Sequence, residues 1–241
     1  MLVPPTFRPA LIIVDVQEDF CPPDGALAVP DGRAIVPTLL RLAALPGFAL
    51  KVATRDHHPP SHVSFAANHP GRTPFASTTT VVNPANPAER YETRLWPVHC
   101  VQGTPGSELV PELRAAEAEG RLDAVVCKGT EPRVEMYSAF RSPLRAPPLA
   151  SAVSDLEARL RRADVTDVFV VGLAGDYCVA STARDARELG WRTYVVQEGT
   201  RCVGGDDGWA DTCKVLVAEG VQVVSEDGEE VGWVKALGGE S

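Results

Sequence analysis

The stretch TDVFVVGLAGDYCVASTARDARELG, residues 166–190, decides the fold. Four apolar residues at positions 168–171 predict a buried strand, and the glycines after them predict a sharp turn. From Cys178 onward apolar residues recur at helical spacing, and Gly190 marks the expected end of the helix. This places Cys178 at a helix N-terminus, where unpaired N–H groups and the helix dipole favour a thiolate. The alternative is a cysteine that only packs as a small apolar side chain.

Apolar runs of the same kind recur along the chain, with helical patterns between them. We expect strands at 10–15, 49–54, 122–127, 167–172, 192–197 and 221–224. We expect helices near 32–44, 107–119, 153–163, 178–189 and 208–219, with Ser107 and Asp155 as start residues. Because the strand runs are continuous rather than alternating, the sheet should be covered on both faces. The sequence therefore predicts an α/β fold, three layers deep, with a six-stranded parallel sheet.

One long connection, at about 56–106, interrupts this alternation and shows no strong periodicity. It contains eight prolines and all five histidines of the chain. Connections of this length are usually functional or disordered, and disorder does not explain the histidines. We therefore expect a single domain over residues 1–241 with a metal-binding insertion at about 56–106. The tail after residue 225 is expected to be a peripheral segment.

Composition narrows the class of protein. A formal net charge of −9 argues against nucleic acid and anionic membranes as partners. The chain shows no signal peptide, no apolar run long enough to span a membrane and no peroxisomal signal in its C-terminal GGES. Six cysteines without CxxC pairs fit reduced thiols. A cytoplasmic location is the resulting expectation.

Reactive side chains follow four of the expected strands. The first strand ends at Asp15, the second runs into Asp56 and His58, the third ends at Lys128, and the fourth leads to Cys178. Because ligands of open parallel sheets bind beyond the carboxyl ends of the strands, these side chains should meet at one edge. Taken singly, a turn cap and a solvated strand end are the commoner explanations of Asp15 and Lys128. Taken together, the residues predict a reactive site.

Histidines of the insertion predict a metal site beside it. Asp56 and His58 are two residues apart, so in an extended chain they share a face and can chelate one ion, with His99 supplied by the far end of the loop. One carboxylate, two imidazoles and open water positions suit zinc, and iron or manganese accept the same ligands. His62 either completes the shell or is a surface histidine. His69 is expected to face solvent.

Five motifs together carry a family resemblance. They are LIIVDVQEDF (11–20), RDHHPPSHVSFAANH (55–69), LWPVHCVQGTPGSEL (95–109), CKGTEPRVEMYSAF (127–140) and VVGLAGDYCVASTARDARELG (170–190). In this order they resemble the nicotinamidases, within the isochorismatase-like cysteine hydrolase superfamily, over roughly residues 10–203. The resemblance implies one Rossmann-like α/β domain of the isochorismatase-like hydrolase fold.

The resemblance also assigns catalytic roles. Asp15 matches the family's catalytic aspartate, Lys128 its lysine and Cys178 its nucleophile. A cis peptide bond before the cysteine is carried over to Leu173–Ala174, and the N–H groups of Ala174 and Cys178 match the oxyanion hole.

Metal and substrate positions follow from the same resemblance. Asp56, His58 and His99 match the ligands of one divalent ion, with zinc as the first expectation, and His62 matches a histidine that ligates metal in some members. The pocket positions are Phe20, Trp96, Tyr137 and Leu173, with core packing as the alternative for Trp96. Two residues depart from the family pattern: His57 stands where a bulky aromatic is usual, and Asp176 stands where a longer acid is common.

The activity implied is hydrolysis of nicotinamide to nicotinic acid and ammonia through a cysteine thioester, in NAD salvage. Pyrazinamide should be accepted as an analogue, and the family includes both monomers and homo-oligomers. The nearest alternative is a related hydrolase acting on another small amide, a ureido compound or a vinyl ether; such relatives generally lack the metal ligands. A binding module would have lost Asp15, Lys128 or Cys178. A nucleotide-binding protein is disfavoured because neither GxGxxG nor GxxxxGK[ST] follows any expected strand.

Overall fold

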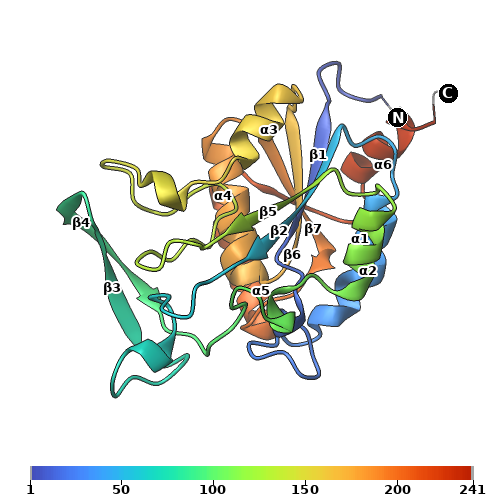
Figure 1. Ribbon diagram of the computed structural model, residues 1–241. Coiled ribbons are helices and arrows are strands. Elements are labelled where there is room, and N and C mark those ends of the chain that lie inside the picture. The colour runs from blue at the N-terminus through green and yellow to red at the C-terminus, as the bar shows by residue number, and fades with distance from the viewer. Residues whose placement is uncertain (1, 240–241) are drawn as a thin grey trace.

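The architecture is a three-layer α/β/α sandwich, described by a computed structural model over residues 2–239 (Figure 1). Its central sheet has six parallel strands in the order β5-β2-β1-β6-β7-β8. The strands are β1 (Pro9–Val14), β2 (Leu50–Asp56), β5 (Ala124–Lys128), β6 (Asp167–Gly172), β7 (Arg192–Thr200) and β8 (Gln222–Val224). The fold class and the six-stranded parallel sheet expected from the sequence are confirmed.

The central strands are apolar throughout because both of their faces are buried. In β1, Leu11 and Ile13 belong to one apolar cluster, whereas Ile12 and Val14 belong to the other. Successive side chains of a strand point to opposite faces, so a strand covered on both sides needs apolar residues at every position. All six residues of β1 and all six of β6 are accordingly buried.

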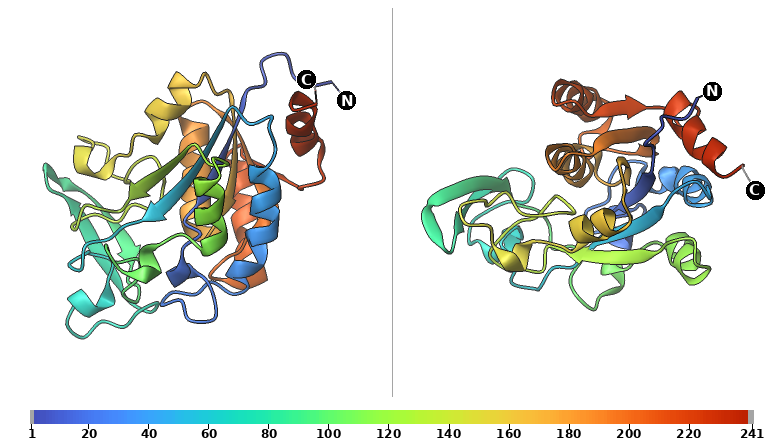
Figure 2. Two further views of the ribbon diagram at one scale, coloured as in Figure 1. Left: turned by 45° about the vertical axis from the view of Figure 1, so that its right-hand side comes forward. Right: turned by 90° about the horizontal axis from the view of Figure 1, so that it is seen from above.

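Helices cover the two faces of the sheet in two groups of three (Figure 1, Figure 2). One face carries α1 (Val36–Ala43), α2 (Pro111–Ala118) and α6 (Glu229–Leu237). The other carries α3 (Leu156–Arg162), α4 (Ala180–Glu188) and α5 (Gly205–Ala218). No helix among residues 2–239 combines the length and hydropathy that crossing a membrane requires.

The start of one helix and the C-terminal tail differ from expectation. Ser107 does not start α2; it ends a short 3-10 turn, η4 (Pro105–Ser107), and α2 begins at Pro111, a residue suited to the first helical turn. Asp155 does stand directly before α3. The tail after residue 225 contains α6, which buries Val231 and Val234 against the sheet, so it is part of the fold rather than a peripheral segment.

The insertion after β2 contains an antiparallel hairpin that the sequence did not predict. It consists of β3 (Thr78–Asn83) and β4 (Asn86–Arg94), and it stands apart from the main sheet (Figure 1). A small apolar cluster joins it to the body of the protein, where Val81 packs with Val134, Leu144 and Ala152. The insertion is therefore ordered, and its two ends supply the histidines of the site.

Candidate active site

The carboxyl edge of the sheet brings together a carboxylate, an ammonium and a thiol. Lys128, the last residue of β5, places its Nζ 2.9 Å from Asp15 Oδ2 and 3.5 Å from Cys178 Sγ. The same Nζ lies 2.5 Å from Asp56 Oδ1 and donates a hydrogen bond to the carbonyl oxygen of Met136. All of the ionisable side chains in this group are buried. The structure thus brings the three residues expected to be catalytic into one cluster.

Burial sets the resting charge of this cluster. It raises the pKa of Asp15 to about 6, against the attraction of Lys128. Burial opposes the charge of Lys128, but the carboxylates of Asp15 and Asp56 outweigh it and raise the Lys128 pKa well above its usual value. Burial also raises the pKa of Cys178 well above its usual value, and the nearby ammonium only partly offsets this. Burial thus favours the neutral thiol, in opposition to the helix terminus and Lys128, which favour a thiolate.

Cys178 lies in the turn that connects β6 to α4. Gly172 has a φ of 118°, and a Cβ at this position would lie 2.0 Å from the carbonyl oxygen of Val14, so only glycine fits. The Leu173–Ala174 peptide bond is cis. A π-helical turn, η6 (Gly175–Val179), then leads into α4. Cys178 therefore lies inside this turn rather than at the first residue of the α-helix.

One backbone N–H group in this turn, that of Ala174, has no hydrogen-bond acceptor in the part of the chain that the structure describes. Among residues 2–239, the N–H of Ala174 donates to no protein acceptor, whereas its carbonyl oxygen accepts from the N–H groups of Tyr177 and Val179. Buried N–H groups are rarely left without a partner. An unused donor next to the cysteine turn is accordingly a site where a ligand oxygen can bind.

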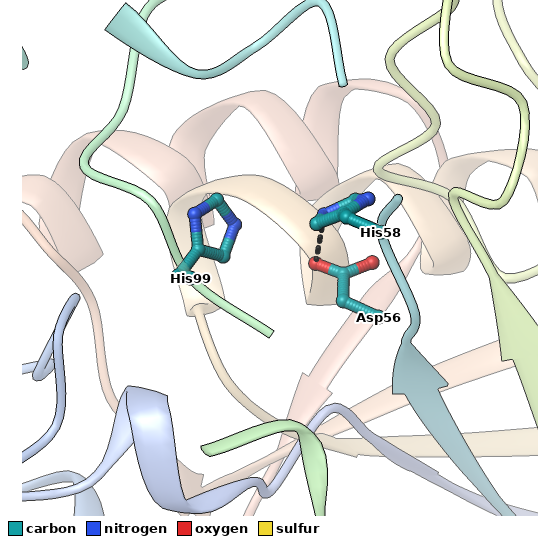
Figure 3. Close-up of side chains that lie close together, drawn as sticks. All are labelled: Asp56, His58 and His99. Atoms are coloured by element: carbon teal, nitrogen blue, oxygen red, sulfur yellow. Dashed lines mark ion pairs between the residues drawn. The ribbon is translucent and has the colours of Figure 1, made fainter. Parts of the chain in front are cut away.

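Asp56, His58 and His99 form a group that fits a metal ion. One ligand atom from each lies within 4.8 Å of the others, and the three side chains point toward one another (Figure 3). His58 Nδ1 lies 2.7 Å from the carbonyl oxygen of Gly129, and His99 Nδ1 lies 2.8 Å from that of Pro97. These carbonyls accept a hydrogen bond from Nδ1–H, so each Nε2 is directed to the group with its lone pair, as in metal-bound histidines.

One buried atom supports this fit directly. His58 Nε2 lies 3.5 Å from Asp56 Oδ2, the contact marked by the dashed line in Figure 3, and it has no hydrogen-bond partner among the described residues. Burial lowers the pKa of His99 to about 4, so this imidazole is a neutral donor. The donor set of one carboxylate and two imidazoles is the kind that zinc and neighbouring divalent metals accept.

The remaining histidines lie outside this group. His62 is fully buried and stacks on His58, with ring centroids 4.0 Å apart. Its Nδ1 contacts Ser64 Oγ at 2.8 Å and its Nε2 lies 3.2 Å from the carbonyl oxygen of Val134. Both ring nitrogens are thus engaged, so His62 is neither a surface residue nor a member of the ligand group. His69 Nε2 lies 2.7 Å from the Val63 carbonyl oxygen, so His69 is half-buried rather than solvent-facing.

A narrow, mainly apolar cavity opens onto these side chains. It is lined by Phe20, Leu27, Asp56, Trp96, His99, Glu135, Tyr137, Ala174, Tyr177, Cys178 and Val203. Three of the four expected pocket residues are present; Leu173 is buried but is not among the lining residues. Trp96 Nε1 donates to the Tyr137 hydroxyl at 2.9 Å, so these two side chains hold each other in place.

Four lining residues were not anticipated from the sequence: Leu27, Glu135, Tyr177 and Val203. Tyr177 directly precedes Cys178, and its ring meets that of Trp96 edge-on at 4.8 Å. Its position next to the nucleophile was an available signal. Asp176 has a role here as well, because its carboxylate accepts hydrogen bonds from the N–H groups of Val203 and Gly204 and so holds one wall of the cavity.

Comparisons with known proteins agree with this geometry. Residues 9–227 match the family model described as the isochorismatase domain. The chain is 36% identical to the nicotinamidase of Acinetobacter baylyi, covering 90% of this chain and 92% of that protein. The crystal structure of the yeast nicotinamidase bound to the inhibitor nicotinaldehyde superposes with a TM-score of 0.82 at 34% identity, covering 90% of this chain and 99% of that one.

A further solved structure shows the same likeness. It is the pyrazinamidase of Pyrococcus horikoshii in complex with zinc, which superposes with a TM-score of 0.66 at 31% identity and covers 90% of this chain and 99% of that one. The family model covers most of the sequence, and the relatives are similar over nearly their whole length. The chain therefore belongs to the isochorismatase family.

Proposed function

We propose that the protein is a nicotinamidase, a hydrolase that converts nicotinamide to nicotinic acid and ammonia. The observation that carries the proposal is the position of Lys128, which contacts Asp15 and lies 3.5 Å from Cys178 Sγ beside the Asp56, His58 and His99 group. The aromatic walls of the adjoining cavity suit a planar pyridine ring. Similarity to nicotinamidases over most of the chain supports this substrate rather than another small amide.

Asp15 acts as the base that activates the sulfur. Its Oδ2 lies 2.9 Å from Lys128 Nζ as an ion pair but makes no directional hydrogen bond among the described residues, so it can accept a proton. Transfer of the thiol proton from Cys178 to Asp15 yields a thiolate next to the Lys128 ammonium. The thiolate attacks the carboxamide carbon. When the C–N bond breaks, Asp15 returns the proton to the leaving nitrogen, ammonia departs and a thioester remains.

Backbone donors stabilise the negative oxygen that forms during the attack. The N–H of Ala174, which has no protein acceptor among residues 2–239, is one donor, and the N–H of Cys178 is the other. A preorganised donor of this kind is worth roughly 10²–10³ in rate. Attack of water on the thioester, with Asp15 taking its proton, then releases nicotinic acid and regenerates the thiol.

Asp56, His58 and His99 hold the divalent ion in this proposal. Zinc is the first candidate, because a similar pyrazinamidase was solved in complex with zinc, and iron or manganese suit the same donors. When bound, such an ion supplies a Lewis acid that orients the pyridine nitrogen or a water molecule at the cavity wall. The protein's own part is to direct both imidazole lone pairs and one carboxylate to a common point.

The test is ammonia release from nicotinamide, with pyrazinamide as analogue and with a ureido compound and a vinyl ether as competing substrates. We expect nicotinamide and pyrazinamide to be turned over and the others to be refused. Cys178→Ala should abolish turnover while leaving the fold intact. Turnover by the alanine variant would remove the nucleophile assignment, and preference for another substrate class would overturn the proposed activity.

A further inference from the structure

Gln17 is wholly buried, and its side-chain amide forms hydrogen bonds with the backbone of Asp56. Oε1 accepts a hydrogen bond from the Asp56 N–H at 2.8 Å, and Nε2 donates to the Asp56 carbonyl oxygen at 2.8 Å. The second Nε2 hydrogen goes to the carbonyl oxygen of Ser107, also at 2.8 Å. Both donors of the amide are therefore used, and the network fixes its orientation. The catalytic scheme above makes no use of this residue.

The path of the chain explains why Asp56 needs this partner. In a parallel sheet, alternate residues of a strand bond to the same neighbouring strand. The carbonyl oxygen of Thr54 accepts from the N–H of Asp15, so Asp56, two residues later, faces the same side. At the level of Asp56, β1 has already ended, because Asp15 has a φ of 50° and turns the chain away from β2. The Gln17 side chain takes the place of the missing strand residue.

The same amide connects the two segments that supply the candidate metal ligands. Asp56 lies at the end of β2, whereas Ser107 belongs to η4, in the segment that follows His99. On its other side, Asp56 pairs with Lys128 across β2 and β5. With Gln17 in place, the main chain of Asp56 is held on both sides, so the point from which its carboxylate projects is fixed before any ion binds.

We propose that Gln17 is a positioning residue that presets Asp56 for a divalent cation. This inference rests on the proposed metal site and goes beyond its ligands. Partners of metal-ligating residues typically change metal affinity about 10- to 100-fold when they are removed. The amide acts on the main chain of a ligand, so its loss should loosen the site without removing any donor atom.

The experiment measures zinc affinity by chelator competition and the visible absorption of the cobalt-substituted protein. Gln17→Met keeps the length of the side chain and removes the three hydrogen bonds. We expect the zinc dissociation constant to rise about 10- to 100-fold and the cobalt spectrum to change. The matched control is Asn83→Leu in the hairpin, because Asn83 is also buried and its amide also makes three hydrogen bonds, to Glu89, Pro147 and Ala85. It should lower stability without changing metal affinity.

Two further variants distinguish a wrong metal site from a wrong role for Gln17. Gln17→Glu retains volume and, as a neutral acid, can keep the bond from the Asp56 N–H and one donor, so it should fold and bind zinc with intermediate affinity. His99→Ala tests the metal site itself, and zinc binding as tight as in the unaltered protein would refute that site. If His99→Ala loses zinc while both Gln17 variants bind it normally, the role of Gln17 is wrong. Equal losses in Gln17→Met and Asn83→Leu would also overturn it.

Discussion

Lys128→Met tests whether the ammonium of Lys128 holds two buried carboxylates in the fold. Its Nζ lies 2.9 Å from Asp15 and 2.5 Å from Asp56, and all three side chains are buried. At 2.9 Å and an effective dielectric of about 20, the gross attraction of one pair is about 6 kcal/mol, part of which offsets desolvation of the ammonium. Removing one partner of a buried ion pair costs about 3–5 kcal/mol. We expect the free energy of unfolding to fall by this amount.

Urea unfolding of chelator-treated protein at neutral pH measures the loss, since ΔG is linear in urea concentration. Adding Asp15→Asn to Lys128→Met removes one uncompensated carboxylate, and at least about 1 kcal/mol should return. The control is Arg159→Met, because the Arg159–Asp155 pair lies on the surface and should contribute well under about 1 kcal/mol. A loss below about 1 kcal/mol for Lys128→Met, or no recovery in the double variant, would refute the electrostatic reasoning.

Two further predictions use matched pairs. Gly172→Ala should lower the free energy of unfolding by more than about 1 kcal/mol, and by clearly more than the control Gly190→Ala. Both glycines have a positive φ, but only at Gly172 would a Cβ meet the Val14 carbonyl oxygen. Equal losses of stability in urea unfolding would contradict this clash. Trp96→Phe should raise KM for nicotinamide more than it lowers kcat and should cost about 0.5–1.5 kcal/mol of stability, because the donor to Tyr137 is lost. Trp233→Phe should leave KM and kcat unchanged and should lose no hydrogen bond, since Trp233 Nε1 has no partner among the described residues.

The sequence was most informative where residues are apolar without interruption. The runs in β1 and β6 are buried on both faces, so composition alone marks them as central strands. Asp15 follows β1 and Lys128 ends β5, so the topology of a parallel sheet places both at the edge where β6 leads to Cys178, and the sequence alone predicts that they meet. His99 follows no strand of the main sheet, and its approach to Asp56 depends on the path of a long insertion, so the histidine content of that insertion indicated it only loosely and the family resemblance assigned it.

The rest depends on contacts that have no periodic signature. The strand β4, NPAERYETR, is polar at most positions because its hairpin buries only a small apolar cluster and meets the body largely through hydrogen bonds, so neither helical nor strand periodicity appears. Gln17 acts through hydrogen bonds to main chain distant in sequence, which no local pattern encodes. The raised pKa of the Cys178 thiol follows from the depth of burial, and a helix start in the sequence does not reveal that depth.

Asp56 links the cluster of Asp15, Lys128 and Cys178 with the candidate metal ligands His58 and His99. One carboxylate oxygen contacts Lys128 at 2.5 Å, and the other faces His58 at 3.5 Å. Asp15 and Asp56 together carry two negative charges, which the single ammonium of Lys128 cannot neutralise, and burial makes the excess costly. A cation held by Asp56 and the two imidazoles would supply the missing positive charge in the same place. The pairing of Lys128 with two carboxylates is thus itself an argument for the proposed ion, and the Gln17 amide holds the main chain of the aspartate that Lys128 and the ion would share.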